Sequence, residues 1–395
     1  MSSDFAEFAE AASQTRRAAA DTPPKFERVA VLGGGDDARL FAALSLAQGC
    51  EVTLFSAYGS ELDAMRASSG IALRGDGPIG TYQFDRADTP SIRLTAQIDA
   101  AVKDADLIFL TGPIHKQRTY AMVLADHLKD GQVVALCPGR SLGALETAWY
   151  LRIGGATADI AIVEVQGAPF WFAAQGAVLT LSEREPAVAA TLPRGRPQVL
   201  DALSVILPNI APCESVLTSG FADGSALVEF PALLMGGPAL ASGAIQIPMG
   251  GAPLPENETF ASLIGPEQRS IIEALAAERH AVAARFGVRD LPDAEGWINQ
   301  HAGALKGRGR RAVPALTEAK ALLRDGVIGS FVPLISAAEL ASVDVPVSRS
   351  MVTLASSVLG ADIASAGRRL DTIGIRAADI DAARSAMDAI ATGAR

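Results

Sequence analysis

VAVLGGGDDARLFAA, residues Val29–Ala43, has the pattern of a short apolar strand, a glycine turn and the start of a helix. Gly33 permits a tight turn, and Gly35 lets the backbone approach a phosphate because it has no Cβ. Ala38 occupies the third position, so the motif is GxGxxA. The helix offers free N–H groups and the positive end of its dipole. A dinucleotide's pyrophosphate needs this order, so the motif predicts a Rossmann-type domain with these three residues at the cofactor.

Two aspartates follow the glycines. Asp36 and Asp37 stand where the helix should receive a diphosphate, which two carboxylates would repel. They also suit the positive end of the helix dipole and could cap the helix. Two alternatives stay open: the carboxylates point away from the phosphates, or the loop no longer binds a dinucleotide well.

Length and composition limit the class of protein. The chain has 395 residues, enough for two domains with buried cores, and 49% of them are apolar, which is typical of a globular protein. The net charge of −10 argues against nucleic-acid and anionic-membrane partners. Three cysteines lie far apart on apolar segments, which is typical of buried, reduced thiols in a cytoplasmic protein. We expect a cytoplasmic protein, and no residue spacing indicates a metal site.

The first half alternates strand-like and helix-like segments, which predicts a parallel sheet with helices on both faces. The expected strands are Val29–Leu32, Glu51–Phe55, Leu107–Thr111, Val133–Cys137 and Ile160–Glu164. The expected helices are Ala38–Gln48, Ile98–Val102 and Tyr120–Leu128. Two strands run into glycine and proline, and such breaks line the ligand crevice of open α/β sheets.

Beyond Pro197 strand signals are nearly absent, and apolar residues recur at helical spacing. The expected helices are Gln198–Leu207, Gln268–Phe286, Ala315–Arg324, Ala337–Ser342, Met351–Leu359 and Ile380–Ala391. We therefore predict an N-terminal extension (1–25), an α/β Rossmann-type parallel-sheet domain that binds a dinucleotide (26–197), and an all-α domain for substrate binding and dimerisation (198–395).

Two weakly polar stretches need an interpretation. Ala161–Leu181 contains charged and turn-forming residues, so it indicates a buried strand followed by a loop rather than a membrane span. Phe230–Pro255 has no charged residue over 26 positions. It belongs either to the core or to a pocket for a largely apolar substrate.

Leu128–Glu146, LKDGQVVALCPGRSLGALE, closely resembles the opine dehydrogenase family. Ile98–Lys116 and Phe331–Ile375 are similar to other parts of that family. The resemblance implies a Rossmann domain and a helical domain with the active site between them. It also implies a reaction that joins an amino acid's amine to a 2-oxo acid with hydride from NAD(P)H. The resemblance further implies a catalytic histidine and a downstream aspartate that orients this histidine.

The family's catalytic histidine falls on Glu229 in this chain, and two preceding asparagines fall on Asp223 and Ser225. Phe230 and Pro231 follow the glutamate. Apolar surroundings would favour the neutral acid and make Glu229 a plausible acid/base near neutral pH. The alternative is a structural glutamate at a helix end.

The family's orienting aspartate matches Asp325. Beside Gly326, Asp325 is equally suited to a turn. If Glu229 and Asp325 lie close together, they would share a proton rather than copy a His–Asp pair.

Other candidates surround the expected crevice. Pro113 lies at a strand end where the cofactor would pass, and His115 matches a family histidine that is either a ligand contact or solvated. Arg140 could hold a phosphate or carboxylate with its planar guanidinium. His301 is a possible substitute base. The basic run Lys306–Arg311 is either a solvated loop or a grip on an acidic ligand.

The end of the second strand bears on the choice of cofactor. An NAD enzyme usually places an acid there, but this chain has Ser56 within Phe55–Tyr58. Serine with a nearby cation, Arg39 or Arg66, favours NADP over NAD.

The leading hypothesis is an NAD(P)-dependent oxidoreductase of opine dehydrogenase type, a homodimer that acts on a small molecule. Glu229 or His115 would manage the proton in this reaction, with Arg140 binding an anion. The second hypothesis is a redox-neutral lyase or isomerase with Glu229 as acid/base. The third is a ligand-binding protein without activity.

Overall fold

An eight-stranded sheet is the framework of the N-terminal half of the computed structural model, which describes residues 24–236, 259–303 and 309–391. From edge to edge its strands are β12 (Ile210–Pro212), β11 (Ala187–Leu192), β8 (Ala161–Val165), β7 (Val133–Leu136), β6 (Leu107–Leu110), β1 (Arg28–Leu32), β2 (Glu51–Phe55) and β5 (Ile92–Thr95). Neighbours from β8 to β5 are parallel, whereas β11 is antiparallel to β8. The predicted Rossmann-type parallel sheet is confirmed.

Helices cover both faces of this sheet. They are α2 (Asp36–Ala47), α3 (Gly59–Ser68), α4 (Ile98–Val102), α5 (Ile114–Leu124), α6 (Gly143–Ile153) and α7 (Pro197–Ile206). Val29 and Val31 of β1 enter one hydrophobic core with α2, α3 and α7, whereas Ala30 and Leu32 enter a second core with α4, α5 and α6. Alternate residues of a buried strand therefore serve opposite layers.

The predicted helix Tyr120–Leu128 is wrong in its bounds. Helix α5 begins at Ile114, directly after Pro113, and ends at Leu124. Proline fixes φ without needing a hydrogen-bonded N–H, so it suits a helix start. The helix thus begins at the carboxyl end of β6, beside the expected crevice.

A second, four-stranded sheet replaces the loop expected after the buried strand at residue 164. Its order is β4 (Gly80–Gln83), β3 (Gly70–Gly75), β10 (Val178–Glu183) and β9 (Phe170–Gln175). Strand β10 pairs in parallel with β3, more than 100 residues earlier. Local periodicity does not reveal such a distant pairing, so the loop prediction was wrong.

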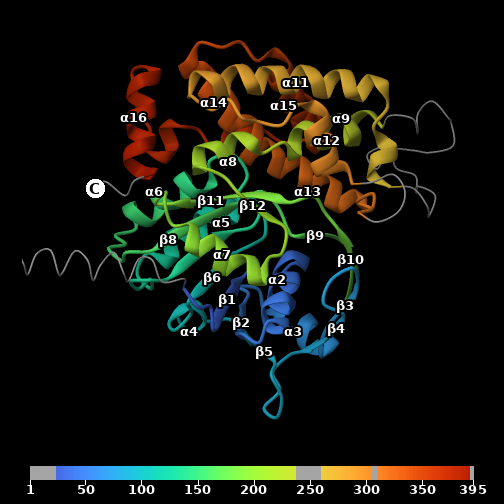
Figure 1. The fold of residues 1–395 in the computed structure, drawn as a ribbon. Helices are drawn as coiled ribbons and strands as arrows, with labels where there is room; N and C mark the ends of the chain where they lie inside the picture. The colour runs from blue at the N-terminus through green and yellow to red at the C-terminus, as the bar shows by residue number, and fades with distance from the viewer. Residues whose placement is uncertain (1–23, 237–258, 304–308, 392–395) are drawn as a thin grey trace, which may run out of the picture.

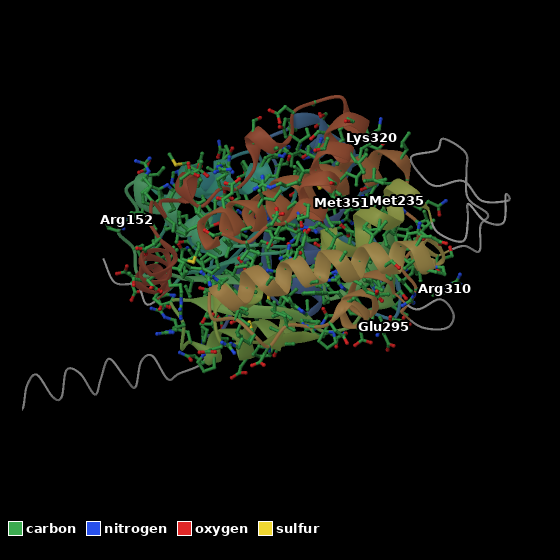
Figure 2. All side chains as sticks on the ribbon, turned by 90° about the horizontal axis from the view of Figure 1, so that it is seen from above. Arg152, Met235, Glu295, Arg310, Lys320 and Met351 are labelled. Carbon is green, nitrogen blue, oxygen red and sulfur yellow. The ribbon has the colours of Figure 1, made fainter. Side chains whose placement is uncertain are left out.

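The second half is helical, as predicted, and lies over one side of the sheet (Figure 1). Its helices are α8 (Val216–Ala222), α9 (Ser225–Met235), α11 (Pro266–Arg285), α12 (Ala294–Ala302), α13 (Leu316–Gly326), α14 (Val332–Ala341), α15 (Pro346–Leu359) and α16 (Ile380–Ala391), with short 3-10 turns at Phe260–Leu263, Ala364–Ala366 and Asp371–Ile373. Seen from above, α11 runs along this helical layer (Figure 2).

The structure changes the predicted start of the helical half and places only part of the predicted uncharged stretch. Strand β12 extends the sheet past residue 197, so a division after Pro212 describes the sheet better, and the domain bounds stay a proposal. Of the uncharged stretch, Phe230–Leu233 are buried within α9. Residues 237–258 and the N-terminal residues 1–23 lie outside the described residues.

One long helix passes through the core. Helices α13 and α14 join through a π-helical turn, η3 (Val327–Phe331), to form one helix over Leu316–Ala341. By length and composition it could cross a membrane, yet 78% of its most apolar window is buried inside the protein. It is therefore a core helix. The π-turn, a feature frequent at functional sites, brings the Gly329 carbonyl within 2.8 Å of the Ser141 N–H.

The buried carboxyl group of Glu164 makes the free energy of unfolding depend on pH. Glu164 of β8 is fully buried and accepts hydrogen bonds from the Ser219 hydroxyl (2.5 Å) and the Ala144 N–H (2.8 Å). Burial nevertheless raises its pKa to about 7.

Because the native state then holds a proton that the unfolded chain releases above about pH 4.5, the contribution of Glu164 to stability falls as pH rises from 4.5 to about 7. We expect Glu164→Gln to remove this decline, measured as the free energy of unfolding in urea at several pH values. Glu185→Gln, at an exposed site, is the control. Parallel pH profiles for wild type and Glu164→Gln would contradict the assignment.

Candidate functional site

The glycine loop has the shape that a pyrophosphate requires. Gly33 has φ +143°, and a Cβ there would overlap the Thr111 hydroxyl. No described atom lies within 4 Å of a Cβ built on Gly35, so the backbone is open at that point. Helix α2 starts directly after it without a side-chain cap among the described contacts, and Ala38 is buried against the sheet. The open backbone and uncapped helix start fit a dinucleotide phosphate.

The two aspartates of this loop have different surroundings. Asp36 forms an ion pair with Arg39 of its own helix. Asp37 has its pKa raised to about 6, chiefly by burial and then by Glu318 and Asp325 of α13. Asp36 is therefore held by its own helix, whereas Asp37 interacts electrostatically with the helical half.

The turn after β7 presents Arg140 to the same place. Arg140 adopts a left-handed backbone conformation (φ 58°), which is uncommon outside glycine. The Gln166 side-chain amide donates to the Arg140 carbonyl at 2.9 Å, and the next N–H bonds to Gly329. The buried Arg140 side chain bonds to the Ser225 hydroxyl and lies 3.6 Å from the Glu229 carboxylate. Gln166 and Gly329 thus hold the backbone of this turn, whereas Ser225 and Glu229 of the helical half hold the guanidinium.

Glu229 is buried in the interior of α9, not at a helix end. Arg311 donates to its Oε1 atom at 2.7 Å. The guanidinium of Arg311 also lies over the rings of Phe260 (3.9 Å) and Trp171 (4.8 Å). The apolar surroundings expected for Glu229 are wrong, because two guanidinium groups flank it. The solvated loop considered for Lys306–Arg311 is also wrong at Arg311, which is buried.

Asp325 and His115 lie where α13 meets the start of α5. Burial raises the pKa of Asp325 to about 6, although Arg140, Arg324 and the Ile114 N–H favour its ionised form. Its buried Oδ1 has no hydrogen-bond partner among the described residues. Burial, then Arg324, lowers the pKa of His115. No described hydrogen bond joins Asp325 to Glu229; instead, both carboxylates interact with Arg140.

Asp223, which the sequence marked only as a departure from the family, joins several elements. It accepts hydrogen bonds from the hydroxyls of Ser141 (3.1 Å), Ser225 (2.5 Å) and Ser330. Burial opposes its ionisation, but Arg140, Arg279 and these hydroxyls outweigh burial and hold its pKa at about 2.

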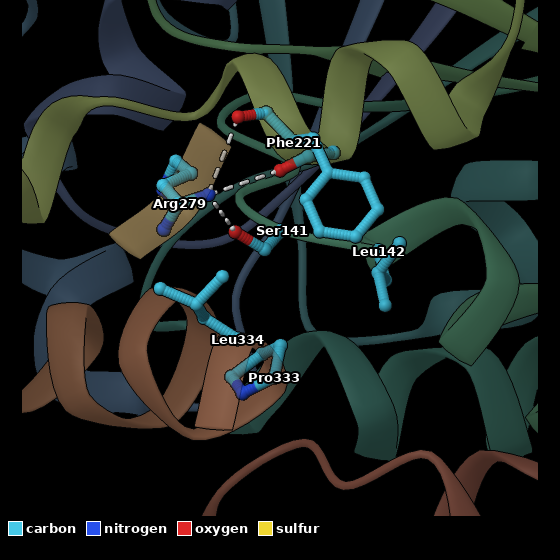
Figure 3. A pocket seen from close by; sticks show the side chains of 7 residues that line it. Ser141, Leu142, Phe221, Arg279, Pro333 and Leu334 are labelled. Atoms are coloured by element: carbon cyan, nitrogen blue, oxygen red, sulfur yellow. Dashed lines mark hydrogen bonds between the residues drawn. The ribbon is translucent and has the colours of Figure 1, made fainter. Parts of the chain in front are cut away.

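Arg279 completes this network from α11. Its guanidinium donates to the Ser141 hydroxyl (3.2 Å) and the Phe221 carbonyl (3.4 Å) beside a small cavity, as Figure 3 shows. The three hydroxyl groups that donate to Asp223 come from different parts of the fold. The sequence around residue 223 therefore does not indicate this role.

The remaining candidates lie around this centre. His301 of α12 is buried, and burial together with Arg184 and Arg311 lowers its pKa well below the usual value, so it is neutral. Pro113 is the N-cap of α5, between that helix and the carboxyl end of β6. Ser56 is buried at the end of β2, where its hydroxyl bonds to the Glu61 carboxylate. The sequence pattern at the strand end does not indicate Glu61, since this residue lies in helix α3 rather than in the strand.

Comparison with known proteins gives a consistent result, although no protein-family model matches the chain. The chain is 26% identical over 374 residues to an opine dehydrogenase of Arthrobacter sp. (strain 1C), covering 91% of this chain and 98% of that protein. It is 24% identical over 377 residues to protein ocs of Agrobacterium tumefaciens (strain Ach5), covering 92% and 99%. The chain is a homologue of opine dehydrogenases. The predicted resemblance is confirmed.

Solved structures agree on the fold. An octopine dehydrogenase structure described with NADH and pyruvate has a TM-score of 0.67 and 17% identity to this chain. The match covers 93% of this chain and 98% of that one. The two-part architecture is therefore shared along nearly the whole chain.

Proposed function

We propose that this protein is an NAD(P)-dependent oxidoreductase of opine dehydrogenase type. The full-length homology to opine dehydrogenases and the open glycine loop support this function. No comparison supports the lyase alternative. The bound nicotinamide would supply hydride to a carbon of the substrate, while Gly33, Gly35, Ala38 and the start of α2 hold the cofactor.

The observation that carries the substrate class is a concentration of guanidinium groups around one buried carboxylate. Arg140 and Arg311 flank Glu229, and Arg184 stacks on Trp171 at 4.1 Å, the ring that Arg311 also covers. Burial and Arg311 lower the pKa of Arg184 to about 9, and its Nε atom has no partner among the described residues. A carboxylate ligand would relieve this repulsion. We infer that the substrates are a 2-oxo acid and an amino acid.

Roles for the candidate catalytic residues follow from their partners. Glu229 is engaged by two guanidiniums, so we assign it to positioning Arg140 and Arg311 rather than to proton transfer. Asp325 has a pKa of about 6 and a free buried oxygen, which suits a general acid/base near neutral pH. His115, beside it, would contact substrate or cofactor.

We also propose a cytoplasmic homodimer. Three cysteines are free thiols, as expected in a reducing compartment. Leu354 and Val358 lie one turn apart on α15, and each is 44% exposed, which would suit a subunit contact.

The test is a direct assay with purified protein, NADH or NADPH, and a panel of 2-oxo acids and amino acids. We expect loss of nicotinamide absorbance in step with formation of a secondary amine dicarboxylate, identified by mass spectrometry. Conversion of these substrates with no change in nicotinamide absorbance would reject the proposal.

Arg311→Met should raise KM for the 2-oxo acid by about ten-fold or more, because a charged hydrogen bond to a carboxylate contributes roughly 1.5–3 kcal/mol. The exposed neighbour Arg310→Met is the matched control and should keep the wild-type KM. KM is measured by steady-state kinetics at saturating cofactor. An equal change of KM in both variants would contradict the role of Arg311 in binding the substrate carboxylate.

A further inference from the structure

We infer that Glu61 selects NAD over NADP by binding the hydroxyls of the adenosine ribose. This inference rests on the proposed function, since it concerns the cofactor of the same site. It reverses the preference for NADP that the strand end alone suggested. The sequence placed no acid at the end of β2, but the fold brings one there from helix α3.

The position of the Glu61 carboxylate is the first step. In this fold the ribose lies at the carboxyl end of the second strand, and here that end is Ser56. The Ser56 hydroxyl donates to Glu61 Oε2 and also accepts from the Tyr58 N–H at 3.1 Å. A Cβ on Gly34 would overlap the Glu61 carboxylate. The carboxylate therefore lies directly against the glycine loop, at the strand end.

The chemistry of this group fits a diol. An ionised carboxylate accepts hydrogen bonds at about four positions, and Ser56 uses one of them. The remaining positions can accept from two ribose hydroxyls. A 2′-phosphate at the same place would bring a second negative group against Glu61, and that repulsion is strong because the carboxylate is partly shielded from water.

The two cations that the NADP hypothesis required are engaged elsewhere. Arg39 pairs with Asp36 and donates to the Gly176 carbonyl at 2.7 Å. Arg66 lies 3.6 Å from Asp63 and 3.5 Å from Asp85. Neither guanidinium is directed to Ser56 in a described contact.

One further cation borders this place. The ammonium group of Lys116, from the start of α5, lies 4.3 Å above the Tyr58 ring. Tyr58 is 49% exposed, and its backbone carbonyl accepts a hydrogen bond from the Glu61 N–H at 3.1 Å. If the charge of Glu61 is removed, Ser56 and Lys116 become groups that could hold a 2′-phosphate.

The experiment measures dissociation constants of NADH and NADPH for the full chain by isothermal titration calorimetry. We expect wild type to bind NADH at least about ten-fold more tightly than NADPH. Glu61→Gln should narrow this ratio by about ten-fold, mainly through tighter NADPH binding. The double variant with Glu61→Gln and Lys116→Met should lose this gain in NADPH affinity.

Asp88→Asn is the control, because the Asp88 side chain is 74% exposed and its ion-pair partner is Arg86 rather than Arg39 or Arg66. It should keep the wild-type ratio. Equal or tighter binding of NADPH by wild type, or the same NADH-to-NADPH affinity ratio in Glu61→Gln and Asp88→Asn, would overturn the role of Glu61 and leave the dehydrogenase proposal standing. If wild type binds neither nucleotide, the proposed function fails and this inference fails with it.

Discussion

Asp325→Asn should lower kcat by about 10²–10⁴-fold and leave the dissociation constant of the nicotinamide cofactor unchanged. The expectation rests on two properties of Asp325. Burial raises its pKa to about 6, and its Oδ1 atom is buried without a partner among the described residues. The amide of asparagine has nearly the same shape but cannot exchange a proton.

The direction in which kcat/KM changes with pH follows from the role of Asp325 as a proton donor. In the reductive direction the group must donate a proton, so kcat/KM of wild type should fall as pH rises through about 6. Asp325→Asn should lack this limb. The measurement is a pH series of steady-state rates at saturating cofactor, with exposed Asp344→Asn as the control.

Two results would contradict the assignment. If Asp325→Asn kept the limb near pH 6 at a reduced rate, another group would carry the proton, and His115 would be the next candidate. If Asp325→Asn stayed within a few-fold of wild type, Asp325 would be a structural residue of α13.

Sequence patterns predicted the local parts of this molecule well. The strand, glycine turn and helix around Gly33 form from neighbouring residues, and the predicted strand Glu51–Phe55 agrees with the structure residue for residue. The helical spacing of apolar residues beyond Pro197 predicted the helical second half. These features depend on periodicity and turn chemistry, which are written within a few residues of one another.

The surroundings of the candidate site could not be predicted in the same way. Arg311 and Glu229 are 82 residues apart, as are Asp223 and Ser141. Burial of Arg311 depends on Trp171, which lies in the four-stranded sheet that no local pattern predicted. Charges that meet only after folding decide whether Glu229 transfers a proton or holds a guanidinium.

The same distant contacts predict the largest stability effect. Asp223→Asn should lower the free energy of unfolding by about 3–5 kcal/mol, because it leaves the charges of Arg140 and Arg279 less compensated in the interior. Asp223 also joins Ser141 of the Rossmann half to Ser330 of the π-turn. Urea unfolding followed by circular dichroism measures the change, with exposed Asp290→Asn as the control.

The pH dependence of this effect separates charge from shape. The pKa of Asp223 is lowered from 3.8 to about 2, so its stabilisation is complete above about pH 3.8 and is lost as pH falls toward 2. The difference in stability between wild type and Asp223→Asn should therefore shrink over that interval. Adding Arg279→Met should recover part of the loss, since it removes one uncompensated charge. A difference that stays constant from pH 4 to pH 2 would mean that hydrogen-bond geometry, not ionisation, makes Asp223 stabilising.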